Sequence, residues 1–421
     1  MISIRGGTVL TMQGWVSADV LIDRDRIVGL EGGGERLEGD SVIDAAGCLV
    51  GPGLVDLHTH LREPGQTWKE DVASGSRAAA AGGFTAVVAM PNTEPPIDSP
   101  KVVEYVVALG EEVDLVDVVP AATLTLARAG TAPSDIVALY DAGVRIFTDD
   151  GDSVADEEVM ERVMEIVARL PGAVVSQHAE DRSITFGGHM HEGATSRRLG
   201  VGGLPSAAEE DVVRRDIGLV RRTGARYHCQ HVSSRRTIDL IRDAKRAGLP
   251  VTAEVTPHHL TFDETYLEGL DPSFKMYPPL RSEQDRLHLI GGLADGTIDA
   301  VATDHAPHQR EEKAVAFDKA PRGVIGLETA AAAVWEALGD RDRMFDALSS
   351  APASIAGLSD QGRPLAPGGV ANVVVFDPAM EWTVSSFHSK SANSPYLGRK
   401  MQGKVRATIR RGRLSYQDGV G

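Results

Sequence analysis

The chain has 421 residues, of which 42% are hydrophobic and 24% charged, values that are ordinary for a folded globular protein. Its formal net charge of −17 argues against nucleic acid or an anionic membrane as a partner, because both are themselves negatively charged. The length predicts one large domain and a smaller one, and no apolar run reaches the ~18 residues of a membrane-spanning helix.

The N-terminal segment MISIRGGTVLTMQGW has neither the long apolar stretch nor the small-residue cleavage pattern of a signal peptide. The chain has 2 cysteines, Cys48 and Cys229, which are too few for a disulfide framework. We therefore expect a cytoplasmic protein in which both cysteines are small buried apolar residues.

Residues 1–50 alternate short apolar strands with Gly-rich turns, and residues 365–421 follow the same pattern. Chain termini often lie close together in a folded domain. We therefore predict that these two end segments combine into one small β-sandwich domain, and that residues 51–364 form the large domain between them.

Short apolar runs alternate with helical stretches throughout residues 51–364, and the helical stretches include 73–83, 156–170, 207–224 and 235–248. Near-continuous apolar strands separated by helices are typical of a parallel sheet in an α/β protein. Strand–helix units over this length predict a (β/α)8 TIM barrel; a doubly wound sheet is the alternative, without a GxGxxG turn to support it. The predicted strands are GLVDLHTH, FTAVVAMPNT, DVVPAATLT, VRIFTDDG, AVVSQHAED, ARYHCQHVSS, LPVTAEVTPHHL and DAVATDHAPH.

The segment 183–205 is Gly-rich and has little periodicity, which predicts a long loop of functional importance. We expect His189 and His191, which lie in it, to face solvent. The stretch 309–322 is either a mobile lid or a solvated surface loop.

Polar side chains gather where the predicted strands end, and this end of a barrel is where active sites lie. Residues i and i+2 of a strand share a face, so His58 and His60 can point at one centre. Imidazole and carboxylate groups are zinc ligands, and a carboxylate can bridge two ions. The pattern predicts a two-metal site built from His58, His60, Asp149 or Asp150, His178, His231 and Asp304. We expect a structural role for His228, His258, His259 and His288.

Several segments resemble the amidohydrolase superfamily and, within it, the class I bacterial dihydroorotases. The similarity extends over almost the whole chain. The segments are DLHTHLREPG, GGFTAVVAMPNTEPPIDS, IFTDDG, QHAED, HVSS, EVTPHHL, PPLRSEQDR, DGTIDAVATDHAPH with EEK, GLET and SKSANSPYLG.

The resemblance implies a role for each metal ligand. His58, His60 and Asp304 match the ligands of a first zinc ion, and His178 and His231 match those of a second. Asp150 matches the carboxylate that, together with a hydroxide, bridges the two ions. Hydantoinases and allantoinases usually place a carboxylated lysine there, and VRIFTDDG offers none.

The resemblance also implies a reaction, the reversible cyclisation of N-carbamoyl-L-aspartate to L-dihydroorotate and water in pyrimidine (UMP) biosynthesis. In the hydrolytic direction the bridging hydroxide attacks the ring amide carbon, and Asp304 carries the proton to the leaving nitrogen. The substrate is a small molecule with a carboxylate, which Arg62 can hold with a bidentate fork. The other predicted substrate-binding residues are His60, Asn92, Tyr277, His308, Arg322 and Gly323.

Two of these positions depart from the pattern of the family, which usually has Asn where Tyr277 stands and an aromatic residue where Arg322 stands. A hydantoinase- or allantoinase-like enzyme is therefore an alternative. A second alternative is a non-catalytic scaffold for aspartate transcarbamoylase. For an enzyme, we expect a homodimer and a possible association with aspartate transcarbamoylase.

Overall fold

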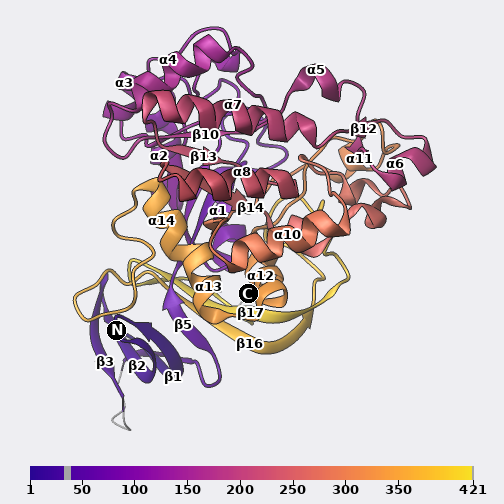
Figure 1. Ribbon diagram of the computed structural model, residues 1–421. Coiled ribbons are helices and arrows are strands. Elements are labelled where there is room, and N and C mark those ends of the chain that lie inside the picture. The colour runs from indigo at the N-terminus through magenta and orange to yellow at the C-terminus, as the bar shows by residue number, and fades with distance from the viewer. Residues whose placement is uncertain (33–38, 420–421) are drawn as a thin grey trace.

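The structure is a computed structural model that describes residues 1–32 and 39–419. The predicted β domain also includes residues 33–38 and 420–421, which lie outside the described residues. Figure 1 shows a helical region above a layer of strands that contains both ends of the chain.

The large region is built on a three-stranded and a five-stranded sheet whose strand pairs are all parallel. Single bridges join the two sheets at both edges, one between Ala122 and Phe147 and one between Thr59 and His305. The strands are β6 (Leu54–Thr59), β7 (Phe84–Ala89), β8 (Asp117–Pro120), β9 (Ile146–Phe147), β10 (Val174–Gln177), β13 (Tyr227–Cys229), β14 (Val251–Val255) and β15 (Ala300–Val301).

Helices lie between these strands along the chain and after the last of them, and α7, α8 and α10 cover one side of the strands in Figure 1. They are α1 (Val72–Ala81), α2 (Pro100–Val113), α3 (Ile136–Asp141), α4 (Glu157–Val167), α5 (Arg182–Thr185), α6 (Ala194–Leu199), α7 (Ala207–Thr223), α8 (Arg235–Arg246), α9 (Pro257–Thr261), α10 (Glu283–Ala294), α11 (Arg310–Lys313), α12 (Ala330–Leu338), α13 (Arg341–Phe345) and α14 (Ala351–Ala356). The 3-10 helices are η1 (Leu126–Arg128), η2 (Glu264–Leu267), η3 (Pro272–Phe274) and η4 (Leu327–Thr329), and η5 (Asp346–Ser350) is a π-helix.

The helix ends follow from local sequence. The Asp156 side chain accepts hydrogen bonds from the first free backbone N–H groups of α4, and Gly224 ends α7 in the left-handed region at φ 72°. Every residue of β6 and β7 is buried, as expected for parallel strands covered on both faces. The prediction of a mixed α/β protein with parallel strands is confirmed.

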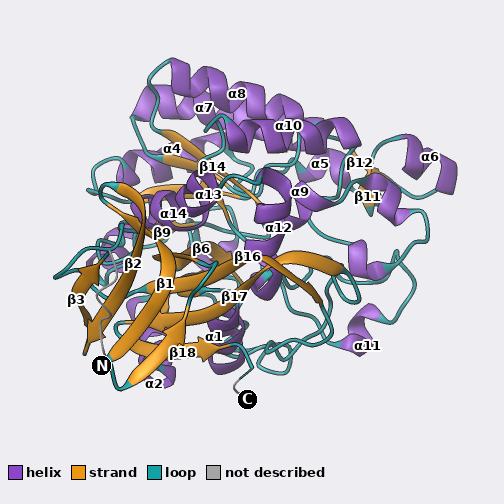
Figure 2. Cartoon of the chain, turned by 90° about the horizontal axis from the view of Figure 1, so that it is seen from below, coloured by secondary structure: helices purple, strands orange, loops and turns teal. Residues whose placement is uncertain are grey.

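The two chain ends share one sheet, ordered β18-β17-β16-β5-β1-β2-β3, with β4 paired to β1. The antiparallel pairing of β5 with β16 joins the N-terminal strands to the C-terminal ones, and Figure 2 shows them side by side. The strands are β1 (Ile2–Thr11), β2 (Gly14–Asp23), β3 (Arg26–Glu31), β4 (Ser41–Asp44), β5 (Leu49–Pro52), β16 (Val373–Thr383), β17 (Lys400–Arg410) and β18 (Arg413–Gln417).

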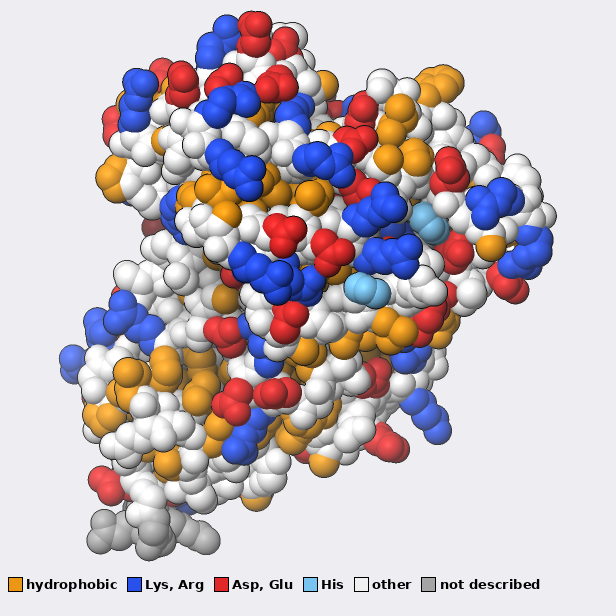
Figure 3. Space-filling view, viewed as in Figure 1, with side chains coloured by type: hydrophobic (Ala, Val, Ile, Leu, Met, Phe, Trp, Pro, Cys, Tyr) orange, Lys and Arg blue, Asp and Glu red, His pale blue; other side chains and the backbone are white. Residues whose placement is uncertain are grey.

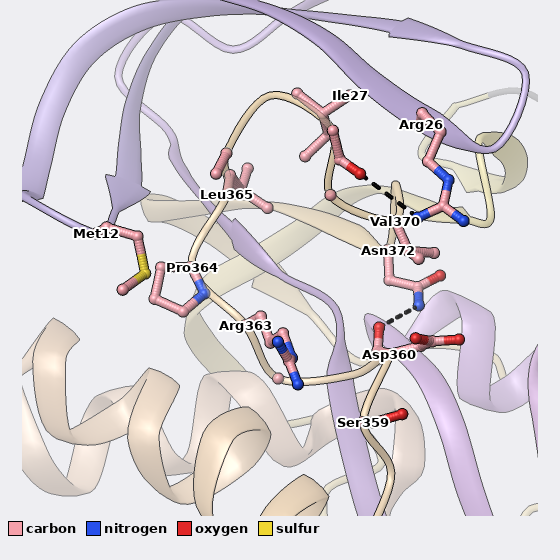
Figure 4. A pocket seen from close by; sticks show the side chains of 14 residues that line it. Met12, Arg26, Ile27, Ser359, Asp360, Arg363, Pro364, Leu365, Val370 and Asn372 are labelled. Atoms are coloured by element: carbon pink, nitrogen blue, oxygen red, sulfur yellow. Dashed lines mark hydrogen bonds between the residues drawn. The ribbon is translucent and has the colours of Figure 1, made fainter.

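The chain passes from this sheet into the parallel strands at Gly53, between β5 and β6. A Cβ at Gly53 would lie 2.2 Å from the Thr85 hydroxyl oxygen, so only glycine fits this crossing without a shift. A cavity of about 570 Å³ lies between this sheet and residues 359–372, and none of the predicted site residues lines it (Figure 4).

The segment 183–205 has more structure than its sequence predicts. It contains α6 and the short paired strands β11 (Met190–His191) and β12 (Gly203–Leu204). Met190 is fully buried in an apolar cluster with Phe262 and Phe317, which fixes the segment. The expectation of a solvent-facing His191 is wrong, because that ring is 9% exposed and its Nδ1 lies 3.4 Å from Arg281.

The face of the molecule drawn in Figure 3 is mixed in charge. In Figure 3, acidic and basic side chains are interspersed over the helices rather than gathered by sign. Within residues 1–32 and 39–419, no helix combines the length and apolar character needed to cross a bilayer.

Candidate metal centre and active site

The carboxyl ends of several parallel strands bring the predicted metal ligands together. His58 belongs to β6, and His60 follows that strand. The other four come just after β9, β10, β13 and β15, and all six are buried: His58, His60, Asp150, His178, His231 and Asp304. Parallel strands place their carboxyl ends at one edge, so residues distant in sequence converge there.

Asp150 lies at the centre of four imidazoles. Its Oδ1 is 3.2 Å from His58 Nε2, 3.7 Å from His231 Nε2 and 3.9 Å from His178 Nδ1. Its Oδ2 is 3.5 Å from His60 Nε2. One carboxylate thus faces both histidine pairs, as a bridging ligand does.

Asp304 lies beside the first histidine pair. Its Oδ1 is 3.0 Å from His60 Nε2 and 3.6 Å from His58 Nε2. Its backbone is in the left-handed region at φ 46°, unusual for a non-glycine residue and often found at functional sites.

The orientation of the rings fits a metal ion. Nδ1 of His58 and of His60 each face an oxygen that can only accept, so each Nδ1 carries the proton. Both Nε2 atoms therefore face the oxygens of Asp150 and Asp304, where a proton on Nε2 or a bound metal cation can join the two groups. Across the second pair, His178 Nδ1 and His231 Nε2 are 2.9 Å apart.

The distances between the ligand atoms also fit a metal ion. His58, His60 and Asp150 form one group whose ligand atoms lie within 4.8 Å of one another, and Asp150, His178 and His231 form a second. Tetrahedral zinc with ligands at ~2.0–2.1 Å separates them by roughly 3.3 Å, close to the distances here. The donor set therefore suits divalent metal ions that share Asp150.

The carboxylates are in the ionised form that ligation needs. Burial pushes the pKa of Asp150 upward, but the imidazoles of His58 and His231 outweigh it and hold that pKa well below its usual range. Burial likewise raises the pKa of Asp304, and the hydrogen bond from His60 with the charge of His58 brings it below its usual range.

Glu254 on β14 supports His58 from behind, and our sequence analysis did not identify it. Its Oε1 accepts from His58 Nδ1 at 2.9 Å, and its Oε2 accepts from His228 Nε2 at 3.0 Å. Burial raises the pKa of Glu254, yet His228 and His58 lower it to about 2. A carboxylate that accepts a hydrogen bond from the ring nitrogen facing away from the metal fixes the tautomer and the orientation of a ligand histidine. The signal in the sequence was a lone acid inside a buried strand.

Asn92 contacts the ligands themselves. Its Oδ1 accepts from His60 Nδ1 at 2.9 Å, and its Nδ2 donates to Asp150 Oδ2 at 3.3 Å. Asp149 faces away from the centre, because its carboxylate accepts from the backbone N–H groups of Leu124 and Thr125.

Arg62 is held near the centre with its guanidinium unused. Its Nε is buried and has no hydrogen-bond partner within residues 1–32 and 39–419. Burial lowers the pKa of Arg62 to about 10, although the carboxylates of Asp304 and Asp150 act in the opposite direction. A half-buried cation whose buried Nε lacks a partner can receive an anionic group.

Tyr277 and Arg322, the two departures from the family pattern, contact each other. The Arg322 guanidinium carbon lies 4.0 Å from the centre of the Tyr277 ring, and its Nη2 donates to the Gly188 carbonyl at 2.6 Å. The Tyr277 ring centre is 5.0 Å from that of His178. This cation–π pair therefore lies next to the second metal group.

His308 and Gly323 are both tied to neighbouring backbone. His308 Nε2 donates to the Arg322 carbonyl at 2.8 Å, and burial, aided by nearby cations such as Arg62, lowers the pKa of His308 to about 2. The Gly323 N–H donates to the Lys275 carbonyl at 2.9 Å, so this backbone donor is already occupied.

Comparison with known proteins places the chain in a family. Residues 47–237 match the family model described as dihydro-orotase-like. A dihydroorotase of Mycobacterium leprae is 45% identical over 94% of both chains. One of Streptomyces coelicolor is 43% identical over 99% of this chain and 98% of its own. The chain belongs to the dihydroorotase family.

Solved structures agree on the fold of this dihydroorotase family member. The L-hydantoinase of Arthrobacter aurescens superposes with a TM-score of 0.87 at 23% identity, covering 100% of this chain and 96% of its own. The D-hydantoinase of a Thermus species gives 0.83 at 25% identity with the same coverage. Identity to the dihydroorotases is much higher, so the hydantoinase-like alternative is not favoured. The chain is a metal-dependent cyclic amidohydrolase, and the alternative of a non-catalytic scaffold is not favoured.

Proposed function

We propose that this chain interconverts N-carbamoyl-L-aspartate and L-dihydroorotate plus water, a step of pyrimidine biosynthesis. The observation that carries the proposal is the position of Arg62, a half-buried cation whose buried Nε has no partner among the described residues, near a centre of four histidines and two aspartates. A cyclic amide that bears a carboxylate matches both features. The relatives named dihydroorotases support the same substrate.

We also propose that the parallel strands form a closed barrel and that the two chain ends form a β-sandwich. The single bridges at both sheet edges favour a closed (β/α)8 barrel over a doubly wound sheet. The buried cluster shared by β1, β2, β16 and β17 is what a β-sandwich of residues 1–50 and 365–421 would contain, with the barrel at 51–364.

We assign two zinc ions to the centre. His58, His60 and Asp304 would hold the first, His178 and His231 the second, and Asp150 would bridge them. When bound, such ions polarise a carbonyl and lower the pKa of water.

The protein side chains then do the following in the hydrolytic direction. Arg62 binds the substrate carboxylate through two parallel hydrogen bonds from its guanidinium. This contact orients the ring amide carbon toward the metal centre. Asp304 takes a proton from the attacking water and delivers it to the leaving ring nitrogen. Glu254 and Asn92 keep His58 and His60 in the tautomer with Nε2 unprotonated. Cyclisation uses the same groups in reverse.

His60, Asn92, Tyr277, His308, Arg322 and Gly323 stay proposals as substrate-binding residues. The homodimer, the association with aspartate transcarbamoylase and the cytoplasmic location likewise stay predictions.

The test is hydrolysis of L-dihydroorotate by zinc-loaded protein, followed by loss of the ring's ultraviolet absorbance. Asp304→Ala is the control, and zinc content is measured in both proteins. Turnover that disappears in the variant is the expected result. A wild-type chain that carries two zinc ions and does not hydrolyse dihydroorotate would refute the proposal.

A further inference from the structure

The connection between β16 and β17 reaches from the small sheet to the active-site loops. Ser391 Oγ donates to the Lys69 carbonyl at 2.7 Å, and the Lys390 N–H donates to Glu70 Oε1 at 3.1 Å. Asn393 lies two residues beyond Ser391 in the same connection and is 6% exposed.

Asn393 joins two segments of the predicted substrate site. Its Oδ1 accepts from the His308 backbone N–H at 3.0 Å. Its Nδ2 donates to the Ala306 carbonyl at 3.0 Å and to the Gly323 carbonyl at 3.1 Å. Its own backbone carbonyl accepts from the Ile325 N–H at 3.1 Å. Residues 306–308 follow Asp304 and end in His308, and residues 322–325 begin with Arg322.

The chemistry of these contacts calls for an amide. Two carbonyls need donors and one N–H needs an acceptor, and an asparagine supplies both from one short side chain. An aspartate would keep the acceptor but set a carboxylate against two carbonyls. A leucine of similar size would leave the His308 N–H and the Ala306 carbonyl without the partner that Asn393 provides, and the Gly323 carbonyl would keep only its bond from Lys313 Nζ at 3.0 Å.

The two segments also touch directly. Ala306 N–H donates to the Val324 carbonyl at 2.8 Å, and His308 Nε2 donates to the Arg322 carbonyl at 2.8 Å. Gly323 has φ 122° and its Cβ position lies 2.7 Å from Ala306 Cβ, so the segments approach as closely as glycine permits. Asn393, in the connection between β16 and β17, hydrogen-bonds to both segments where they meet.

We propose that Asn393 is a positioning residue for catalysis: by holding residues 306–308 against 322–325, it fixes His308 and Arg322 relative to Asp304. This inference rests on the proposed function, because those side chains are its substrate-binding residues. It gives the C-terminal connection of the small sheet an indirect part in catalysis, through the backbone of residues 306–308 and 322–325.

The test compares Asn393→Asp and Asn393→Leu with Asn372→Asp. Asn372 is a matched control, since it is 3% exposed and donates to the Asp360 carbonyl at 3.0 Å, beside the cavity of Figure 4. Hydrogen exchange of the backbone amides, zinc content, kcat and KM for L-dihydroorotate are measured for each protein.

We expect both Asn393 variants to exchange faster at 306–308 and 322–325, to keep their zinc, and to lose about 10- to 100-fold in kcat/KM. Because Asn393 would act through His308, the double variant Asn393→Asp with His308→Ala should lose much less than the product of the two single losses. The Asn372 variant should change neither these exchange rates nor KM.

Three results would overturn the inference: unchanged exchange at both segments, faster exchange with unchanged kcat and KM, or fully additive losses in the double variant. A wild-type chain without turnover would refute the proposed function separately. The exchange comparison would then still decide whether Asn393 holds the two segments together.

Discussion

Glu254→Gln tests whether the carboxylate behind His58 sets the strength of metal binding. The substitution keeps the shape of the side chain and removes its charge. A hydrogen bond to a charged group contributes about 1.5–3 kcal/mol and a neutral one about 1 kcal/mol. The 2.9 Å bond from His58 would therefore weaken by about 0.5–2 kcal/mol, or about 2- to 30-fold in metal affinity.

The glutamine amide adds a second effect. If its NH₂ group faces His58, that ring must accept at Nδ1 and carry its proton at Nε2, which removes the lone pair directed at Asp150. Both effects act in the same direction, so we expect roughly tenfold weaker zinc binding.

Zinc affinity is measured by competition with a chromophoric chelator at constant pH. Asp216→Asn is the matched control, because Asp216 is a fully buried acid that contacts Arg215 and Tyr227 but none of the predicted ligands. Affinity within twofold of wild type for Glu254→Gln, or an equal loss in Asp216→Asn, would refute the reasoning.

Three further predictions concern substrate binding, pH and packing. Arg62→Lys replaces a planar fork by a point charge and should raise KM for dihydroorotate about tenfold with zinc content unchanged, whereas an unchanged KM would exclude Arg62 from the carboxylate contact. Burial raises the pKa of Asp216 to about 6. The folded chain thus binds the Asp216 proton more tightly than the unfolded chain. The protonated Asp216 contributes its whole share to the unfolding free energy below about pH 4, and this contribution is lost as the pH rises to about 6. The difference in unfolding free energy between wild type and Asp216→Asn should fall by about 3 kcal/mol over that range, measured by urea unfolding, and a difference independent of pH would contradict it. Gly51→Ala puts a Cβ 2.3 Å from the Phe345 ring and should cost about 1–3 kcal/mol of stability, while Gly218→Ala, with no atom within 4 Å, should not; equal melting temperatures would contradict the clash.

The main elements of the fold could be predicted from local patterns. The helix predicted at 207–224 is observed as α7 (Ala207–Thr223), because its apolar spacing and its terminal glycine are both local signals. The structure of the segment 183–205 could not be predicted from local patterns. Its short strands and the burial of Met190 depend on side chains from distant parts of the chain, such as Phe262.

The amino-acid sequence by itself determined which residues can act as ligands and at which strand ends they stand. His58 and His60 share a face because a strand alternates every second residue, and this needs no knowledge of the rest of the chain. Only the tertiary structure decided which polar groups support them. Glu254 hydrogen-bonds to His58, and Asn393 hydrogen-bonds to the backbone of His308; in both cases the two residues are far apart in the sequence. Such contacts depend on how strands and loops pack, and no local repeat in the sequence predicts them.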